Sequence, residues 1–343
     1  MKAIVAHAAK DLRIETREIP KPEPGQVLIR MQTGGICGSD LHYYHNGGFG
    51  AVRLKEPMIL GHEVSGIVET LGEGVTGLQT GQLVAVSPSR PCQACEYCHE
   101  GKQNHCLNMR FYGSAMPFPH IQGAFQQWLV ADAEQCAIAD GLTAGEAAMA
   151  EPLSVVLHAA SQAGDLLGKR VLVTGCGPIG LLAVLVARAA GAAQIVATDI
   201  TDYTIGVARQ IGADIAHNVA EAPSALQDYA AGKGHFDVLF ECTGVAPVVA
   251  STIPALRPGA TMIQLGLGGD MTLPVQAMTA KELRFKGSFR FHSEFFDAVN
   301  LMRNGRLDVK PLITHTLPLA DSIEAFDLAS DRTRALKVQL DFA

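Results

Sequence analysis

The stretch Lys169-Arg170-Val171-Leu172-Val173-Thr174-Gly175-Cys176-Gly177-Pro178-Ile179-Gly180 decides the fold of a large part of this chain of 343 residues. Its first half is an apolar, β-branched run typical of a buried strand, and residues 181–190 are typical of a helix. A G-x-G-x-x-G turn between a strand and a helix has the context of a dinucleotide-binding site. Gly175 would allow the tight turn, Gly177 the approach of a pyrophosphate, and Gly180 close helix–strand packing.

The residues that follow the turn extend this prediction. Pro178 and Ile179 open the helix, whose unpaired N–H groups would face the phosphates. The next predicted strand ends in Asp199, an acid placed to bond a ribose diol. Its carboxylate would repel a 2′-phosphate, and Asp202 adds a second negative charge. Because no basic residue occurs between positions 198 and 208, NAD is favoured over NADP.

Strand and helix patterns alternate across residues 151–290. Predicted strands follow at 194–198, 237–242, 260–265 and 283–287, with helices at 153–163, 201–212 and 245–256. This alternation predicts an α/β domain with a doubly wound parallel sheet. Residues 1 to about 85 instead show short β segments separated by Gly and Pro, and residues 291–343 mix helix and short strand. These parts predict a second, β-rich domain.

Three residues near the N-terminus offer different zinc-ligand types. Cys37, His62 and Glu63 supply a thiol, an imidazole and a carboxylate, which suit an open catalytic zinc site. Adjacent strand residues face opposite ways, so the last two need a turn of the backbone, which Gly61 and Gly66 permit. These residues alone leave open an alternative: a buried cysteine, a satisfied histidine and a surface glutamate.

The spacing Cys92-x2-Cys95-x2-Cys98-x7-Cys106 predicts a second metal site. Four soft ligands at short spacing can close a tetrahedron around zinc and leave no open position, which indicates a structural role. Basic neighbours could suggest a zinc knuckle that binds nucleic acid. The net charge of −7 disfavours that hypothesis.

Composition narrows the class of protein further. Hydrophobic residues make up 48% and charged residues 18%, which is an ordinary globular composition. The acidic balance argues against nucleic acid or an anionic membrane as the main partner. The N-terminal residues lack a signal-like apolar block, and the longest apolar run, 179–187, is too short to span a bilayer. We therefore expect a soluble, cytoplasmic protein.

Taken together, the motifs resemble one family across the whole chain. Their order is that of zinc-dependent medium-chain dehydrogenases, and three stretches resemble the polyol (sorbitol-type) branch. The general motifs are Cys37-Gly38-Ser39-Asp40, Gly61-His62-Glu63, the four cysteines, Glu151-Pro152-Leu153-Ser154 and the nucleotide turn, and the narrower stretches are 34–44, 108–116 and 287–291. The resemblance implies a GroES-like catalytic domain, 1–150 with 291–343, and an inserted Rossmann domain, 151–290.

The resemblance also assigns the metal ligands. It places Cys37, His62 and Glu63 at a catalytic zinc, in addition to the structural zinc of the four cysteines. Glu151 stands where the polyol branch keeps a carboxylate that ligates the metal directly or through water. Simple alcohol dehydrogenases have a ligating cysteine there, so the glutamate favours polyols.

Two residues suit a route for the hydroxyl proton. Ser39 and His42 provide a hydroxyl and an imidazole at relay spacing, and the family likeness supports a route through the ribose of the cofactor. A surface histidine is the alternative for His42.

Substrate contacts are expected from five residues. Arg290 would bond substrate hydroxyls, and it or Arg110 could pair with a carboxylate; the alternative for Arg110 is a cap on the cysteine segment. Tyr43, Phe111 and Phe291 are candidate pocket walls, with core packing as the alternative for Phe111.

The function implied is oxidation of a secondary hydroxyl with hydride transfer to NAD, reversibly, at C5 of L-idonate to give 5-keto-D-gluconate. A dehydrogenase of uncharged polyols such as sorbitol or xylitol is the first alternative, and a non-catalytic zinc protein the second. The family suggests a homodimer or homotetramer.

Overall fold

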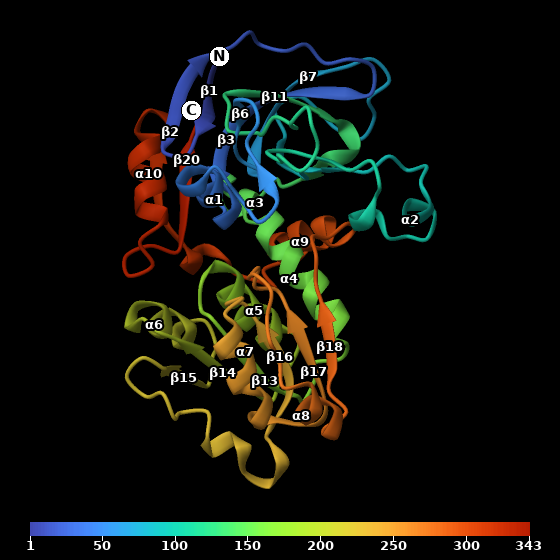
Figure 1. The fold of residues 1–343 in the computed structure, drawn as a ribbon. Helices are drawn as coiled ribbons and strands as arrows, with labels where there is room; N and C mark the ends of the chain where they lie inside the picture. The colour runs from blue at the N-terminus through green and yellow to red at the C-terminus, as the bar shows by residue number, and fades with distance from the viewer. The chain divides into compact units, whose positions relative to one another are not determined.

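The computed structural model describes residues 1–343, which form two compact units (Figure 1). The first comprises Met1–Ser154, His292–Asp331 and Lys337–Ala343, and the second comprises Val155–Phe291 and Arg332–Leu336. The sequence analysis gave the whole tail to the first unit, whereas the structure groups Arg332–Leu336 with the second. No helix combines the length and apolarity needed to cross a membrane.

The second unit is built on a six-stranded parallel sheet in the order β15-β14-β13-β16-β17-β18. The strands are β13 (Arg170–Thr174), β14 (Gln194–Asp199), β15 (Ile215–Asn218), β16 (Phe236–Glu241), β17 (Leu256–Gln264) and β18 (Arg284–Gly287). Counted from its own first strand, the order is 3-2-1-4-5-6, the doubly wound arrangement that binds dinucleotides. The predicted parallel sheet is therefore confirmed.

Helices connect these strands (Figure 1). They are α4 (Ala150–Ala163), which crosses the boundary between the units, α5 (Pro178–Ala189), α6 (Asp202–Gln210), α7 (Ala246–Thr252) and α8 (Val275–Ala280), with 3-10 turns η3 (Asp228–Lys233) and η4 (Ile253–Ala255). Leu172, Val196, Leu239 and Met262, one from each central strand, are buried in a single apolar cluster. Helices on both faces of the sheet explain why its strands read as continuous apolar runs.

The first unit contains a seven-stranded sheet in the order β12-β8-β7-β3-β20-β19, with β11 also paired to β3. A three-stranded sheet, β2-β1-β6, and two ribbons, β4-β5 and β9-β10, complete its β structure. The strands are β1 (Lys2–Ala8), β2 (Asp11–Thr16), β3 (Gln26–Gly35), β4 (Gly48–Phe49), β5 (Val52–Arg53), β6 (Met58–Ile59), β7 (Glu63–Leu71), β8 (Leu83–Val86), β9 (Ser89–Arg90), β10 (Arg110–Phe111), β11 (Trp128–Asp132), β12 (Cys136–Ile138), β19 (Ile313–Pro318) and β20 (Lys337–Asp341).

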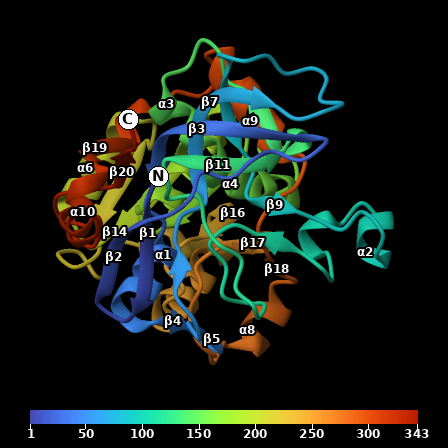
Figure 2. The same ribbon diagram turned by 90° about the horizontal axis from the view of Figure 1, so that it is seen from above.

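Short helices lie between these strands. They are α1 (Gly38–Asn46), α2 (Glu96–His99), α3 (Ala144–Ala148), α9 (Glu294–Arg303) and α10 (Ser322–Ala329), with 3-10 turns η1 (Gln103–His105), η2 (Ala133–Gln135), η5 (Lys310–Leu312) and η6 (Leu319–Asp321). The C-terminal strand β20 pairs antiparallel with β3, with Gln339 opposite Gly35 (Figure 2). This pairing brings the last strand of the chain to the residues just before Cys37.

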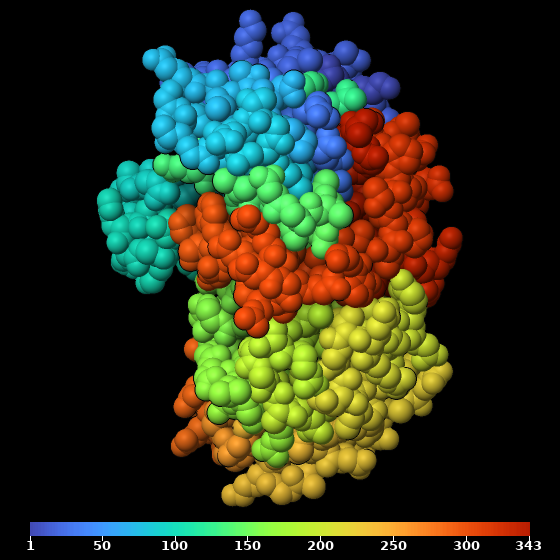
Figure 3. Space-filling model, turned by 180° about the vertical axis from the view of Figure 1, so that it is seen from behind, coloured from blue at the N-terminus to red at the C-terminus, as the bar shows by residue number.

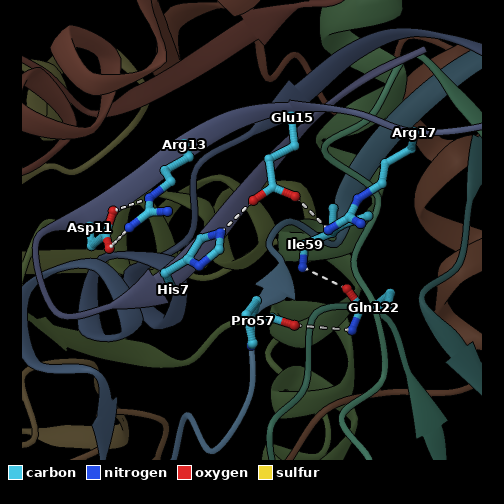
Figure 4. A network of polar contacts seen from close by, with 8 residues as sticks. All are labelled: His7, Asp11, Arg13, Glu15, Arg17, Pro57, Ile59 and Gln122. Atoms are coloured by element: carbon cyan, nitrogen blue, oxygen red, sulfur yellow. Dashed lines mark hydrogen bonds and ion pairs between the residues drawn. The ribbon is translucent and has the colours of Figure 1, made fainter.

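The hairpin of β1 and β2 carries a polar network on its surface (Figure 4). Glu15 pairs with His7 and, at 2.6 Å, with Arg17. Gln122 accepts a hydrogen bond of 2.8 Å from the Ile59 N–H. Surface ion pairs contribute about 1 kcal/mol or less each, so these contacts add little to the stability of the hairpin.

Candidate active site

The side chains of Cys37, His62 and Glu63 converge within the first unit, and their ligand atoms lie within 4.8 Å of one another. Cys37 directly precedes α1, His62 precedes β7, and Glu63 is the first residue of β7. Pairing of β3 with β7 sets Glu63 opposite Gly35, two residues before the cysteine. Two neighbouring strands thus bring together ligands that are distant in sequence.

The turn that lets the two adjacent ligands approach one ion lies at Gly61. Its φ is +90°, and a Cβ there would collide with the ring of Phe125. Gly66 does not turn the chain: it lies within β7, where a Cβ would press on the backbone of β3 beside a register shift. Of the two glycines named from sequence, only Gly61 supplies the turn.

The donor set fits a metal ion. His62 is buried, and its Nδ1 has no hydrogen-bond partner; the nearest carboxylate oxygen, Oδ1 of Asp40, is 3.8 Å away. Burial, and then the carboxylate of Glu63, raise the pKa of the Cys37 thiol to about 12. A divalent cation would stabilise the thiolate and remove that penalty. Thiolate, imidazole and carboxylate oxygen are the ligand types of catalytic zinc.

Asp40, to which the sequence analysis assigned no role, connects the segment that carries Cys37 to the segment that carries His62 and Glu63. Its Oδ2 accepts the N–H of Cys37 and its Oδ1 accepts the N–H of Gly61, both at 3.0 Å. The side chain is fully buried, and burial raises its pKa. An acid three residues after a helix cap is the sequence signal that could have revealed this role.

Glu63 is buried rather than on the surface, and it is paired with Lys337 at the start of β20. Nζ of Lys337 lies 2.7 and 2.6 Å from the two carboxylate oxygens and 3.3 Å from the carbonyl of Ile36. Burial acts to lower the pKa of Lys337, but the charges of Glu63 and Cys37 outweigh it and raise that pKa. The sequence gives no sign that this lysine is buried.

Glu151 lies beside the group but is not one of the three close ligands. It stands in the first turn of α4 and is buried. Burial raises its pKa to about 8, while His62 lowers it and Glu63 raises it. Its carboxylate is therefore close enough to interact with the ligands.

Helix α1 carries three of the predicted site residues. Ser39 is half-buried and His42 is exposed, with its ring 5.9 Å from that of Phe49. Tyr43 is buried, and its hydroxyl accepts the N–H of Ala115 at 3.0 Å. Spacing of three residues places the serine and the histidine on one face of the helix.

The two residues of strand β10, both predicted to contact the substrate, lie in different surroundings. The ring of Phe111 is buried and lies 5.6 Å from that of His62. Arg110 instead lines a cavity of about 610 Å³ together with Arg90 and His120. Because consecutive strand residues point to opposite faces, the arginine points away from the face that meets His62.

Two predicted substrate residues belong to the second unit. Arg290 follows β18 with a φ of +56°, and its guanidinium lies 4.9 Å from the centre of the Phe289 ring. Phe291 is fully buried.

The sulfur atoms of Cys92, Cys95, Cys98 and Cys106 also lie within 4.8 Å of one another. Cys98 lies within α2 and the other three cysteines flank this helix in sequence, in a lobe that stands out from the first unit (teal in Figure 3). Hydrogen bonds, first from the backbone of Ala94 and then from Asn108, lower the pKa of Cys92 to about 6. Four close thiols, none in a disulfide, with donors directed at sulfur fit a closed structural zinc.

The nucleotide turn lies between β13 and α5. Gly175 has a φ of +81°, and a Cβ on Gly180 would collide with the carbonyl of Gly175. Gly177 is the N-cap of α5, and Pro178 and Ile179 begin the helix. Asp199, at the end of β14, accepts the N–H groups of Cys176 at 2.5 Å and Ile200 at 2.7 Å. Its carboxylate is thus fixed beside the turn.

A candidate zinc site and a doubly wound nucleotide domain in one chain are features expected of a zinc-dependent dehydrogenase. Residues 23–140 match the alcohol dehydrogenase GroES-like domain, and residues 178–304 match the zinc-binding dehydrogenase domain. The chain belongs to the zinc-dependent medium-chain dehydrogenase family, as its motifs predicted.

Similar proteins narrow the branch to sorbitol and idonate dehydrogenases. L-Idonate 5-dehydrogenase (NAD(P)(+)) of Escherichia coli K12 is 43% identical over 92% of each chain. Sorbitol dehydrogenase of Gallus gallus is 38% identical over 98% of this chain and 95% of that one. The crystal structure of L-idonate 5-dehydrogenase from Escherichia coli K-12 superposes with a TM-score of 0.95 at 40% identity, over 99% of this chain and 97% of that chain. The chain is therefore an NAD(P)-dependent zinc dehydrogenase of the polyol and sugar-acid type.

Proposed function

We propose that this enzyme oxidises the C5 hydroxyl of L-idonate to 5-keto-D-gluconate, reversibly, with NAD as hydride acceptor. The convergence of Cys37, His62 and Glu63 on one ligand group is the observation that carries the reaction type. The similarity to a sugar-acid dehydrogenase at 43% identity supports the substrate.

Different residues of the chain would hold the metal and move the proton. Cys37, His62 and Glu63 would hold the catalytic zinc, with Glu151 beside it. When bound, zinc would lower the pKa of the substrate hydroxyl, and the nicotinamide would take the hydride. Ser39 and His42 would carry the hydroxyl proton along α1 towards the exposed imidazole.

Arg290 is the better candidate for the substrate carboxylate. Arg110 faces away from the side of β10 that meets His62, and it lines another cavity. Arg290 has a positive φ, which a residue with a side chain adopts at a cost and which occurs often at functional sites. A guanidinium can hold a carboxylate by two parallel hydrogen bonds.

The preference for NAD rests on Asp199. Its carboxylate is held at the end of β14 by two backbone N–H groups, and Asp202 lies in the following helix. A 2′-phosphate would meet two negative charges. We expect a kcat/KM for NAD at least tenfold above that for NADP.

A substrate panel tests the proposal. With NAD, we expect L-idonate to exceed sorbitol and xylitol in kcat/KM by at least tenfold, and 5-keto-D-gluconate to be reduced by NADH. Arg290→Ala should lower kcat/KM for idonate more than for sorbitol, whereas Arg110→Ala should leave both unchanged. Good turnover of sorbitol with inert idonate would instead support an uncharged polyol as substrate, the alternative favoured by the sorbitol dehydrogenases at 38% identity.

A further inference from the structure

The cavity of about 610 Å³ in the first unit is lined by none of the three metal ligands. Its volume lies within the range of small-molecule sites, about 300–1,000 Å³. The charged side chains in its lining are three arginines, Arg17, Arg90 and Arg110, and one carboxylate, Glu18. Positive charge therefore exceeds negative charge around this cavity.

Two of these arginines stand directly opposite each other. Arg90 and Arg110 are cross-strand partners in the ribbon of β9 and β10, and like charges in such a pair destabilise it. Asp132 pairs with Nε of Arg90 at 2.5 Å, and Glu15 pairs with Arg17 at 2.6 Å (Figure 4). Arg110 makes no hydrogen bond or ion pair within the chain. An anion between the two facing guanidinium groups would remove their repulsion.

This arrangement distinguishes Arg110 from the other exposed arginines of the unit. Arg53 and Arg306 also lack an ion pair, but neither lines the cavity, and Arg53 stands opposite a glycine. We propose that the cavity is a binding site for a small anion, whose carboxylate or phosphate group is held by Arg110 together with Arg90. A guanidinium presents paired N–H donors that match these oxyanions. The ion pair of Arg90 uses Nε, so its Nη groups remain available to the ligand.

The proposed anion site is separate from the metal group. Arg110 and Tyr112 line the cavity, whereas Phe111 between them lies with its ring 5.6 Å from that of His62. Successive side chains of this short segment thus alternate between the two places. A ligand in the cavity would not occupy the place of the substrate, so the proposal does not depend on which polyol or sugar acid the enzyme oxidises.

The single tryptophan of the chain can report binding without turnover. Trp128 begins β11, directly before Leu129 and Val130, which line the cavity. The zinc-loaded full chain, without NADH, is titrated with D-gluconate, with glucose 6-phosphate and with sorbitol. We expect a saturable change in fluorescence with at least one of the two anions, which distinguishes a carboxylate from a phosphate ligand, and none with neutral sorbitol.

Variants then locate the anion. Arg110→Ala should weaken its binding about tenfold or more, because charge-assisted hydrogen bonds are lost, and Arg110→Lys should recover part of the affinity. Arg53→Ala, which removes an unpaired arginine outside the cavity, is the matched control and should bind within twofold of the unmodified protein. Arg290→Ala should also bind within twofold, because Arg290 belongs to the candidate substrate site.

Three results would overturn the inference. The first is the absence of a saturable response to either anion, and the second is an equal response to sorbitol. The third is an affinity that falls in Arg290→Ala but not in Arg110→Ala, which would place the anion at the substrate site. Urea unfolding of each variant shows whether a loss of binding reflects damage to the fold, and Arg110→Lys then decides the outcome.

Discussion

At the scale of single residues, Asp40 shows how one buried carboxylate can organise a metal site. It accepts the N–H of Cys37 and the N–H of Gly61, the residue just before His62 and Glu63. The ligands are thus positioned through the backbone before any ion binds. Groups that orient metal ligands in this way commonly change metal affinity 10- to 100-fold when they are replaced.

Asp40→Asn should therefore weaken zinc binding about tenfold or more and destabilise the fold by roughly 1–3 kcal/mol, because an amide can accept only with its oxygen and leaves one N–H facing its NH2 group. Competition with a chelator and urea unfolding measure the two effects. Asp11→Asn, on the exposed β1–β2 hairpin, is the control and should change neither.

The pair of Lys337 and Glu63 leads to a second residue-scale prediction. Lys337→Met should leave a buried carboxylate unpaired and destabilise the metal-free protein by about 3–5 kcal/mol. Zinc bound to that carboxylate would replace the lost charge, so the loss in the zinc-loaded protein should be smaller. Unfolding of both forms in urea checks this; equal losses with and without zinc would contradict a role of Glu63 as ligand.

At the scale of elements, α3 illustrates a helix start that depends on ionisation. Thr143 caps the helix, and Glu146 accepts the N–H and the hydroxyl of Thr143 at 2.9 and 2.7 Å. Burial acts to raise the pKa of Glu146, but the hydrogen bonds from Thr143 and the charge of Lys310 lower it below its ordinary value of 4.5. Because the folded pKa is depressed, this stabilisation is complete above about pH 4.5 and is lost as pH falls through the folded pKa.

Glu146→Gln should accordingly lower the free energy of unfolding by a constant amount above pH 5, and the difference from the unmodified protein should shrink below pH 4.5. Thr143→Ala should lower the free energy of unfolding by about 1 kcal/mol, because the helix loses its N-cap. Urea titrations between pH 3 and pH 7 test both, and a difference that grows on acidification would show that the sign is wrong.

The cysteine lobe around α2 is a second element with its own requirement. A helix of four residues cannot be stable alone, so the bound ion should maintain the lobe. Cys98→Ser should lose one zinc per chain and make the bond after the exposed Lys102 susceptible to trypsin. Cys136→Ser, a buried cysteine outside the lobe, is the control; resistance of Cys98→Ser to trypsin would refute this role of the metal.

At the scale of the whole molecule, the sequence predicted the nucleotide unit well because its signals are local. The strand at 170–174 and the turn at 175–180 were read directly, and the sheet order confirmed them. Helix α1 was missed because Gly38–Asn46 has little amphipathic pattern. The pairing of β20 with β3 brings Lys337 to Glu63, which lies 274 positions away in the sequence, and nothing in either segment predicts this contact.

In the candidate site too, some features follow from local sequence and others depend on contacts between distant segments. The ligand types of Cys37, His62 and Glu63 were legible from sequence, whereas the burial of Glu63 and the bridging role of Asp40 depend on tertiary contacts. Residues 332–336 enter the second unit for only five residues. A domain boundary predicted from the secondary-structure pattern alone cannot detect so short a segment.

The central claim is that Cys37, His62 and Glu63 share one catalytic zinc, separate from the zinc of the four cysteines. The most direct measurement is the zinc content per chain of the unmodified protein and of Cys37→Ser, together with NADH affinity. We predict two zinc ions in the unmodified protein, and in the variant one zinc ion, no measurable turnover and unchanged NADH binding. One zinc ion in the unmodified protein, or two in an active Cys37→Ser variant, would contradict the claim.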